Sequence, residues 1–179
     1  MKRDMTDLND TELVTLSLDG DEIAFGILVK RYEVQMYRTA IGIVKSNEVA
    51  RDVTQRSFLK CWEKLDSYNA NHKFFSWLYR IIVNESLNYL RKEKNHVEIP
   101  NDYSTQEGPL SYLLKSELLK SLATSINNLS DDHRIVIQLR HFEGLSYEDI
   151  ADVLDIDKKT VKSRLYEARM NLRNMLSDH

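Results

Sequence analysis

Side chains suited to binding nucleic acid gather near the C-terminal end of this sequence. Lysine and arginine can hydrogen-bond to guanine edges, and threonine and serine can contact phosphates or bases. Residues of these types follow one another along a single expected helix: Lys158, Lys159, Thr160, Lys162, Ser163, Arg164 and Arg169. We therefore expect this helix to contact DNA.

The segment just before this helix supports that interpretation. Ser146, with Asp149 three residues later, has the pattern of a capping box that opens a short helix. A turn at 155–157 then leads into the basic helix, which Asp157 can cap. A short helix, a tight turn and a longer basic helix make a helix-turn-helix, whose second helix enters the major groove. A solvated basic helix on an ordinary bundle explains the charge, but not the capped helix and the turn before it.

A second candidate surface lies on an expected helix that begins near Asn47. Apolar or small residues recur along it at helical spacing from Val49 to Leu65 and indicate its buried side. The opposite side carries Glu48, Asp52, Gln55, Arg56, Leu59 and Glu63. An exposed leucine among polar residues suits a protein interface with an apolar centre and a charged rim. A solvated face with one stray leucine is also common, so the residues alone leave both interpretations open.

A third candidate surface is formed by the polar stretch 67–73 and the helix expected at about 75–93. Polar residues at spacings of four, four and three make one stripe on this helix, and the charge at its end can bind phosphate. The stripe and the charge comprise Arg80, Asn84, Asn88, Arg91 and Lys92. In the preceding loop, Tyr68, Asn69, Asn71 and His72 can stack on or hydrogen-bond to an unpaired base. For Trp77 we favour core packing over base stacking, and Tyr79 fits either role.

The elements that position these surfaces are expected to be helices. Only 5 glycines and 2 prolines occur in 179 residues, and helix-forming residues fill the long segments. Both prolines lie in 95–110 among turn-forming residues, which indicates a flexible linker. We therefore expect an all-α protein of two small helical domains, 1–94 and 111–179, the second containing the helix-turn-helix.

Composition narrows the class of function further. The single cysteine, Cys61, excludes an internal disulfide and suits a buried position in a protein of a reducing compartment. The five histidines show no metal-binding spacing, and no glycine-rich phosphate loop or nucleophile elbow occurs. We expect no catalytic residue, metal or cofactor. Without a signal sequence or an apolar run of spanning length, we expect a cytoplasmic protein that does not insert into a membrane.

The net charge of -3 is unusual for a nucleic-acid binder. Basic residues are concentrated at 91–94 and 158–173, whereas acidic residues crowd the first turns and the stretches 131–132 and 148–149, so local basic surfaces lie on an acidic protein. Such a chain is expected to bind DNA weakly alone and to depend on a partner.

The helix-turn-helix segments resemble a known family. The stretches 146–151 (SYEDIA), 160–165 (TVKSRL) and 168–169 (AR) are similar to the fourth domain of the extracytoplasmic-function (ECF) sigma factors of bacterial RNA polymerase. In that family this domain recognises the minus thirty-five promoter element. The resemblance implies this role for the basic helix.

The N-terminal half resembles the second domain of the same family. The stretch 52–58 (DVTQRSF) is similar to the helix that docks on the clamp coiled coil of the polymerase β′ subunit. The resemblance thus favours polymerase binding by Asp52, Gln55, Arg56, Leu59 and Glu63. The stretch 74–81 (FFSWLYRI), continuing to Arg91, resembles the segment that separates the strands at the minus ten element and captures a flipped base. The family also implies an anti-sigma factor as a regulatory partner, and the sigma interpretation predicts a monomer when free.

Four residues depart from the family pattern. Arg56 replaces a usual acid in the polymerase-binding helix, and Asn88 replaces a frequent aspartate in the melting helix. Lys159 and Glu167 stand where glycine and arginine are common. The promoter sequence that this chain prefers is therefore the property that the resemblance to the family predicts least.

Two alternative functions predict different behaviour. A conventional operator-binding regulator would be a stable homodimer that binds DNA tightly without polymerase. A protein that only sequesters polymerase or a sigma factor would be insensitive to neutralising Lys162 and Arg164.

Overall fold

A computed structural model describes residues 4–96 and 117–177, and every regular element in this part of the chain is a helix. The first domain consists of η1 (Met5–Asp7), α1 (Asp10–Leu18), α2 (Glu22–Val44), α3 (Asn47–Glu63), η2 (Leu65–Ser67) and α4 (Phe74–His96). The second consists of α5 (Glu117–Asn127), α6 (Asp131–Ile137), the π-helical turn η4 (Gln138–Phe142), α7 (Tyr147–Leu154) and α8 (Lys158–Ser177). The expected all-α class is confirmed.

Side-chain caps explain where the helices of the first domain begin. The Asn9 side chain accepts from the backbone of Glu12, whose carboxylate accepts in return from Asn9, so α1 opens with a capping box. The Asp21 carboxylate accepts from two backbone amides at the start of α2. The Ser46 hydroxyl caps α3. Each cap satisfies amide groups that have no partner within the helix.

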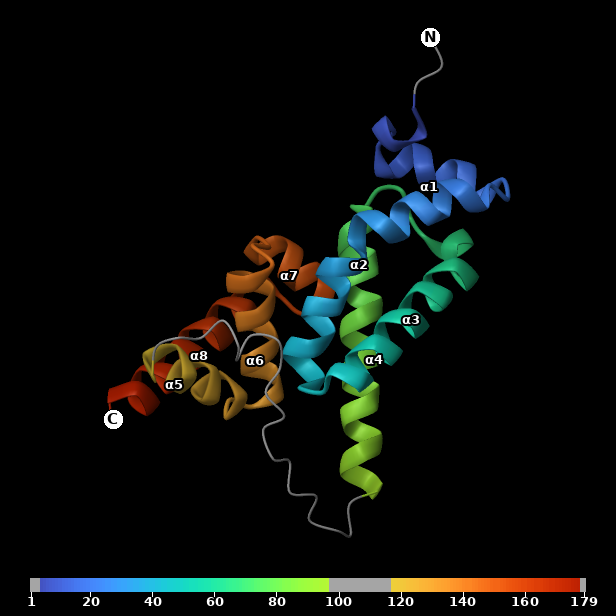
Figure 1. The fold of residues 1–179 in the computed structure, drawn as a ribbon. Coiled ribbons are helices and arrows are strands. Elements are labelled where there is room, and N and C mark those ends of the chain that lie inside the picture. The colour runs from blue at the N-terminus through green and yellow to red at the C-terminus, as the bar shows by residue number, and fades with distance from the viewer. Residues whose placement is uncertain (1–3, 97–116, 178–179) are drawn as a thin grey trace.

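The core of the first domain lies between α2, α3 and α4, with α1 across one end (Figure 1). Its largest fully buried side chains are Leu13, Leu28, Met36, Ile43, Leu78, Ile82 and Val83. Helix α4 runs through the middle of the molecule and presents one side to this core. It extends to His96, two residues into the expected linker, and the rest of that linker lies outside the described residues.

The second domain contains the expected helix-turn-helix. The Ser146 hydroxyl and the Asp149 carboxylate form the capping box of α7. Helix α7 ends at Leu154, the next residue Asp155 has φ 55° in the left-handed region, and Asp157 then caps α8. The buried residues of α8 are Val161, Leu165 and Ala168, which recur at helical spacing along one side of the helix.

The two domains pack against each other. Helices α2 and α4 of the first domain lie beside α6, η4 and α7 of the second (Figure 1). Within the described residues, no helix combines the length and apolar character needed to span a membrane.

Candidate nucleic-acid interface

The N-terminal turns of α8 present the basic side chains to solvent. The Asp157 carboxylate accepts from the Thr160 backbone amide at 2.6 Å. This hydrogen bond lowers the pKa of Asp157, so the cap stays ionised at the positive end of the helix. Because the buried stripe lies on the other side, these expected residues are exposed: Lys158, Lys159, Lys162, Ser163 and Arg169. Helix α8 is thus oriented as a recognition helix requires.

Several of these side chains already have partners within the domain. The Arg164 guanidinium donates to Asp132 of α6 at 2.8 Å and is partly buried, whereas Lys158 pairs with Glu148 of α7. Arg169 lies 3.3 Å from Nε2 of His141, and burial together with Arg169 and Arg140 lowers the pKa of that histidine. Arg164 therefore joins α8 to α6, while Lys159 and Lys162 project from the outer side.

The acid at position 167 also has intramolecular partners. Glu167 accepts from the Ser163 hydroxyl at 3.0 Å and lies 3.3 Å from His133 of α6. These contacts hold its carboxylate against the domain, on one side of the basic surface.

Tyr166 is a candidate that the residue-type argument missed. Its side chain is 66% exposed and lies one helical turn after Lys162, on the side of α8 opposite Val161 and Leu165. An exposed aromatic ring in the centre of a basic recognition surface can contact base methyl groups or sugar. The period of the buried stripe was the signal that could have identified it, because that period places position 166 outward.

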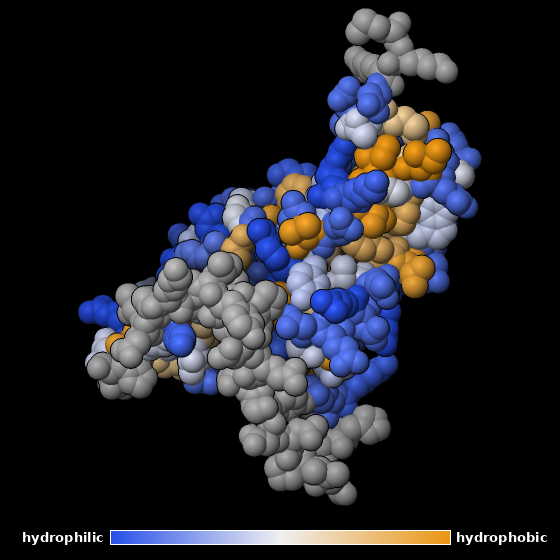
Figure 2. Space-filling model, in the orientation of Figure 1, coloured by the Kyte–Doolittle hydropathy of each residue, from blue (hydrophilic) through white to orange (hydrophobic). Residues whose placement is uncertain are grey.

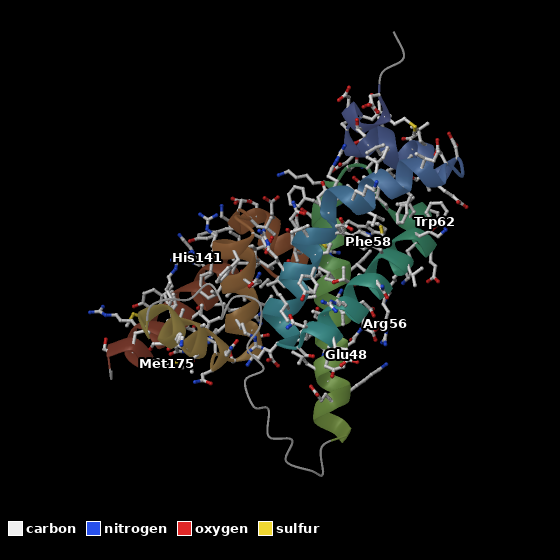
Figure 3. All side chains as sticks on the ribbon, viewed as in Figure 1. Glu48, Arg56, Phe58, Trp62, His141 and Met175 are labelled. Atoms are coloured by element: carbon white, nitrogen blue, oxygen red, sulfur yellow. The ribbon has the colours of Figure 1, made fainter. Side chains whose placement is uncertain are left out.

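Helix α3 carries the second candidate surface on its solvent side. All of the expected face is exposed: Glu48, Asp52, Gln55, Arg56, Leu59 and Glu63. Arg56 donates to Asp52 at 2.7 Å one turn away, so this departure from the family pattern neutralises a neighbouring acid. Leu59 is 63% exposed. Figure 3 shows Glu48, Arg56 and Trp62 spaced along α3, on the side of the molecule away from the second domain.

Apolar surface continues beyond Leu59 toward the end of α3. Trp62 is exposed on one side and packs edge-on against Phe25 of α2, with ring centroids 4.8 Å apart. Leu18 and Ile23, near the junction of α1 and α2, are also exposed. Figure 2 shows apolar surface over this end of the first domain. Sequence reasoning did not identify Trp62, because its packing partner is on another helix.

The third candidate surface is the outer side of α4 together with the loop before it. Each member of the expected stripe is exposed: Arg80, Asn84, Asn88, Arg91 and Lys92. In the loop, Asn69 accepts from the Asn71 backbone amide at 2.9 Å, and both residues are exposed. The amides of this loop are thus available to a base.

The aromatic residues beside the loop are packed together. Tyr68 donates from its hydroxyl to the carbonyl of His72 at 2.6 Å, and its ring lies against Phe74 and Trp77. Burial raises the pKa of the Tyr68 hydroxyl. Trp77 packs against the core through Phe74, in line with the interpretation favoured from the sequence. Tyr79 is buried and donates to Glu143 of the second domain at 3.1 Å, so its role is structural.

Arg80 is held by the second domain. Its Nε donates to the carbonyl oxygen of Asp152 at 3.1 Å, and a terminal guanidinium nitrogen donates to the same oxygen. Asp152 lies in the last turn of α7, the first helix of the helix-turn-helix. One of the residues expected to contact the minus ten element therefore lies against the domain expected to contact the minus thirty-five element.

Metal-binding geometry is not found in the described part of the chain, where no group of three or more His, Cys, Asp or Glu residues is placed to hold an ion. Cys61 is buried, and burial raises the pKa of its thiol to about 12. Its thiol is therefore unsuited to ligation or nucleophilic attack at neutral pH.

Comparisons with known sequences agree with this division into two domains. Residues 28–96 match the family model for sigma-70 region 2, and residues 119–172 match that for sigma-70, region 4. The chain is 35% identical to the ECF RNA polymerase sigma-E factor of Haemophilus influenzae, covering 94% of this chain and 96% of that protein. It is also 35% identical to the sigma-E factor of Escherichia coli strain K12, covering 93% and 94%. These matches give no support to the operator-binding homodimer.

Solved structures share the arrangement of both domains. CnrH in complex with the cytosolic domain of CnrY is similar with a TM-score of 0.74 and 27% identity, over 94% of this chain and 97% of that one. The sigma factor RpoE of Bartonella quintana, in complex with the anti-sigma factor NepR, has a TM-score of 0.68 and 26% identity over 86% and 96%. The chain therefore belongs to the extracytoplasmic-function sigma factors, the transcription initiation factors of bacterial RNA polymerase.

Proposed function

We propose that the two domains divide the work of promoter-specific initiation between three surfaces. The outer side of α3 binds the β′ clamp of core RNA polymerase, α4 and the loop before it separate and bind the minus ten element, and α8 binds the minus thirty-five element. This proposal rests on one observation. All three surfaces are exposed on one all-helical protein, in which sigma-70 region 2 precedes region 4 along the chain.

The α3 surface has the character of a protein interface. Leu59 is exposed at its centre, and Asp52, Gln55, Arg56 and Glu63 surround it. A hydrophobic centre within a polar rim is the usual anatomy of a specific protein contact. The Arg56–Asp52 pair lowers the net negative charge of the rim, so the apolar contact carries more of the binding here.

The two DNA-binding surfaces differ in what they can recognise. Helix α8 carries lysines that reach phosphates or guanine edges of a duplex. The α4 stripe and the loop offer amide groups, which suit the edges of unpaired bases, and Arg91 and Lys92, which suit phosphates. This distribution matches recognition of the upstream element as a duplex and of the minus ten element as a separated strand.

Regulation by an anti-sigma factor follows from the comparisons. Both CnrH and the Bartonella RpoE are seen in complexes with protein partners, one of them an anti-sigma factor. A partner of this class would cover the exposed apolar surface near Trp62 or the α3 surface. We propose further that the chain has no catalytic activity of its own, is a monomer when free, and acts in the cytoplasm, where the polymerase works.

The proposed division is tested on a promoter that this chain recognises with core polymerase. The double substitution Lys159→Ala and Lys162→Ala should weaken binding to the duplex promoter, because two phosphate or base contacts disappear. It should therefore also reduce the amount of transcript from that promoter. The matched control is Lys30→Ala, an exposed lysine on α2 outside all three surfaces. If the double variant initiates as well as the control, α8 does not bind the promoter. A protein that merely sequesters polymerase would also behave in that way.

A further inference from the structure

Helix α8 carries a single acidic residue among its 20 positions, and this residue, Glu167, lies at the edge of the basic surface that we propose binds DNA. Glu167 follows Ser163 by one helical turn and is adjacent to Tyr166, and its side chain is 57% exposed. A carboxylate at this place opposes binding to DNA of any sequence, because it repels phosphate. A compensating contact with one base would make it favourable on some sequences and unfavourable on others.

Both oxygens of the Glu167 carboxylate are held within the second domain. Oε1 accepts from the Ser163 hydroxyl at 3.0 Å, and Oε2 lies 3.3 Å from Nε2 of His133 on α6. The amide nitrogen of Asn171 lies 3.4 Å from Nδ1 of the same histidine. Because an amide nitrogen only donates, Nδ1 is the acceptor, and Nε2 carries the ring proton that Glu167 accepts. Two donors from two helices thus fix the carboxylate.

These contacts leave only hydrogen-bond acceptors at this point of the surface. Each carboxylate oxygen keeps a second lone pair after it has accepted one hydrogen bond. The Ser163 hydroxyl donates its hydrogen to Glu167, so its oxygen presents lone pairs alone. Lys159 and Lys162, which are exposed on the same helix, present only donors. Helix α8 therefore offers two opposite kinds of base contact.

A group that only accepts hydrogen bonds discriminates among the bases by the edges that they present in the major groove. Guanine presents the acceptors N7 and O6, and thymine presents the acceptor O4 and a methyl group, so neither can donate. Adenine donates from N6, but its N7 acceptor lies beside that amino group and would face the carboxylate. Cytosine donates from N4 and has a C–H group beside it. The chemistry of this site thus favours cytosine.

We propose that Glu167, positioned by Ser163 and His133, selects a cytosine in the minus thirty-five element. The inference rests on the proposed binding of α8 to that element, and it adds a base preference to it. Glu167 contacts the base, whereas Ser163 and His133 act through Glu167 as positioning residues. On other sequences the carboxylate faces an acceptor or a phosphate without a partner, which lowers affinity. The acid therefore raises discrimination while it lowers affinity for DNA in general.

Selection from a promoter library tests this proposal. A promoter that the full chain recognises with core polymerase is prepared with its upstream element randomised, and the DNA bound by the reconstituted holoenzyme is sequenced. We expect the wild type to enrich cytosine at one position by about tenfold, the size of one good base contact. Glu167→Ala should lose the enrichment at that position only. Glu167→Gln should shift it toward adenine, because an amide both donates and accepts and can pair with N6 and N7.

A second measurement separates base discrimination from general affinity for DNA. Fluorescence anisotropy measures binding of each holoenzyme to the selected duplex and to one in which the cytosine–guanine pair is inverted. Glu167→Ala should lower the ratio of the two affinities about tenfold, and it should strengthen binding to the inverted duplex because a charge that repels phosphate is lost. Ser163→Ala and His133→Ala should each lower the ratio by less. Glu33→Ala, at an exposed acid on α2 outside the three surfaces, is the matched control and should leave the ratio unchanged.

An unchanged base preference in the Glu167→Ala holoenzyme overturns the inference, as does enrichment by Glu167 of any base other than cytosine. Equal losses of affinity for both duplexes also overturn it, because a merely structural role would produce them. The double variant Lys159→Ala and Lys162→Ala distinguishes the inference from the function on which it rests. If it selects the same elements as the wild type with equal affinity, α8 does not bind the promoter, and the proposed function fails. If it loses affinity while the Glu167 variants change nothing, α8 binds the element and the cytosine preference alone is wrong.

Discussion

Truncation of Leu59 to alanine should weaken polymerase binding without weakening the fold. Its side chain is 63% exposed, so the free protein has little packing to lose. Complete burial of a leucine contributes about 1.5–3 kcal/mol, and the exposed part, less the methyl group that alanine retains, corresponds to roughly 1–1.5 kcal/mol on binding. We therefore expect about a tenfold loss of affinity for core polymerase. The free energy of unfolding should change by less than about 0.5 kcal/mol.

The affinity is measured by titrating a fluorescently labelled chain with core polymerase, and the stability by urea unfolding. Val34→Ala is the matched control, because Val34 is an exposed apolar residue on α2 outside the proposed surface. An unchanged affinity in the Leu59→Ala protein, with native circular dichroism, would refute the reasoning and move the polymerase interface to another part of the molecule. A loss of similar size in both variants would show that the contact is not specific to α3.

Two further predictions concern the second domain. Tyr166→Ala should reduce affinity for the duplex minus thirty-five element several-fold, because an exposed ring at the centre of the basic surface is lost. The melting temperature of the protein should stay the same. Fluorescence anisotropy measures the affinity and thermal unfolding the stability, and equal affinities of variant and wild type would exclude a DNA contact. Burial acts to raise the pKa of Asp149, but hydrogen bonds from Ser146 and Lys73 outweigh it and hold the pKa below its ordinary value. The stabilisation by this carboxylate is therefore complete above the ordinary pKa of about 4 and is lost as the pH falls through the lower pKa of the folded state. Asp149→Asn should destabilise the protein at pH 7 and should do so much less at the acid end of its folded range. Urea unfolding at both pH values measures the change in the free energy of unfolding. An equal decrease at both pH values would contradict the stabilising role of the Asp149 carboxylate.

Local features of the fold could be predicted from the sequence because their causes are local. Asp21 and the Ser146–Asp149 pair cap helices through residues two or three positions away. The exposed side of α3 follows from the period of its buried stripe, of which Val53 and Cys61 are members. In each case a short stretch of chain contains both partners of the interaction.

Contacts between distant residues could not be predicted in the same way. The hydrogen bond from Arg80 to Asp152 joins positions 72 residues apart, and nothing in either helix alone indicates it. The pairing of Arg164 with Asp132 likewise depends on how α6 packs on α8. Both arginines were assigned to DNA from their type and spacing, whereas the fold gives each of them an intramolecular partner.

The contrast between Trp62 and Tyr166 shows a further distinction. The environment of Trp62 depends on Phe25 of another helix, so its place beside the α3 surface required the structure. The exposure of Tyr166 follows from the buried stripe of its own helix and could have been predicted. Selection of candidates by residue type favoured cationic and hydroxyl side chains, and it therefore missed the exposed aromatic ring of Tyr166.

Run-off transcription tests the central claim most directly. Purified chain is combined with core RNA polymerase and a library of bacterial genomic DNA, and the transcript ends are mapped. The account predicts defined start sites that require both components, each preceded by a common pair of upstream elements. If no start site depends on this chain across the library, its assignment as an initiation factor is contradicted.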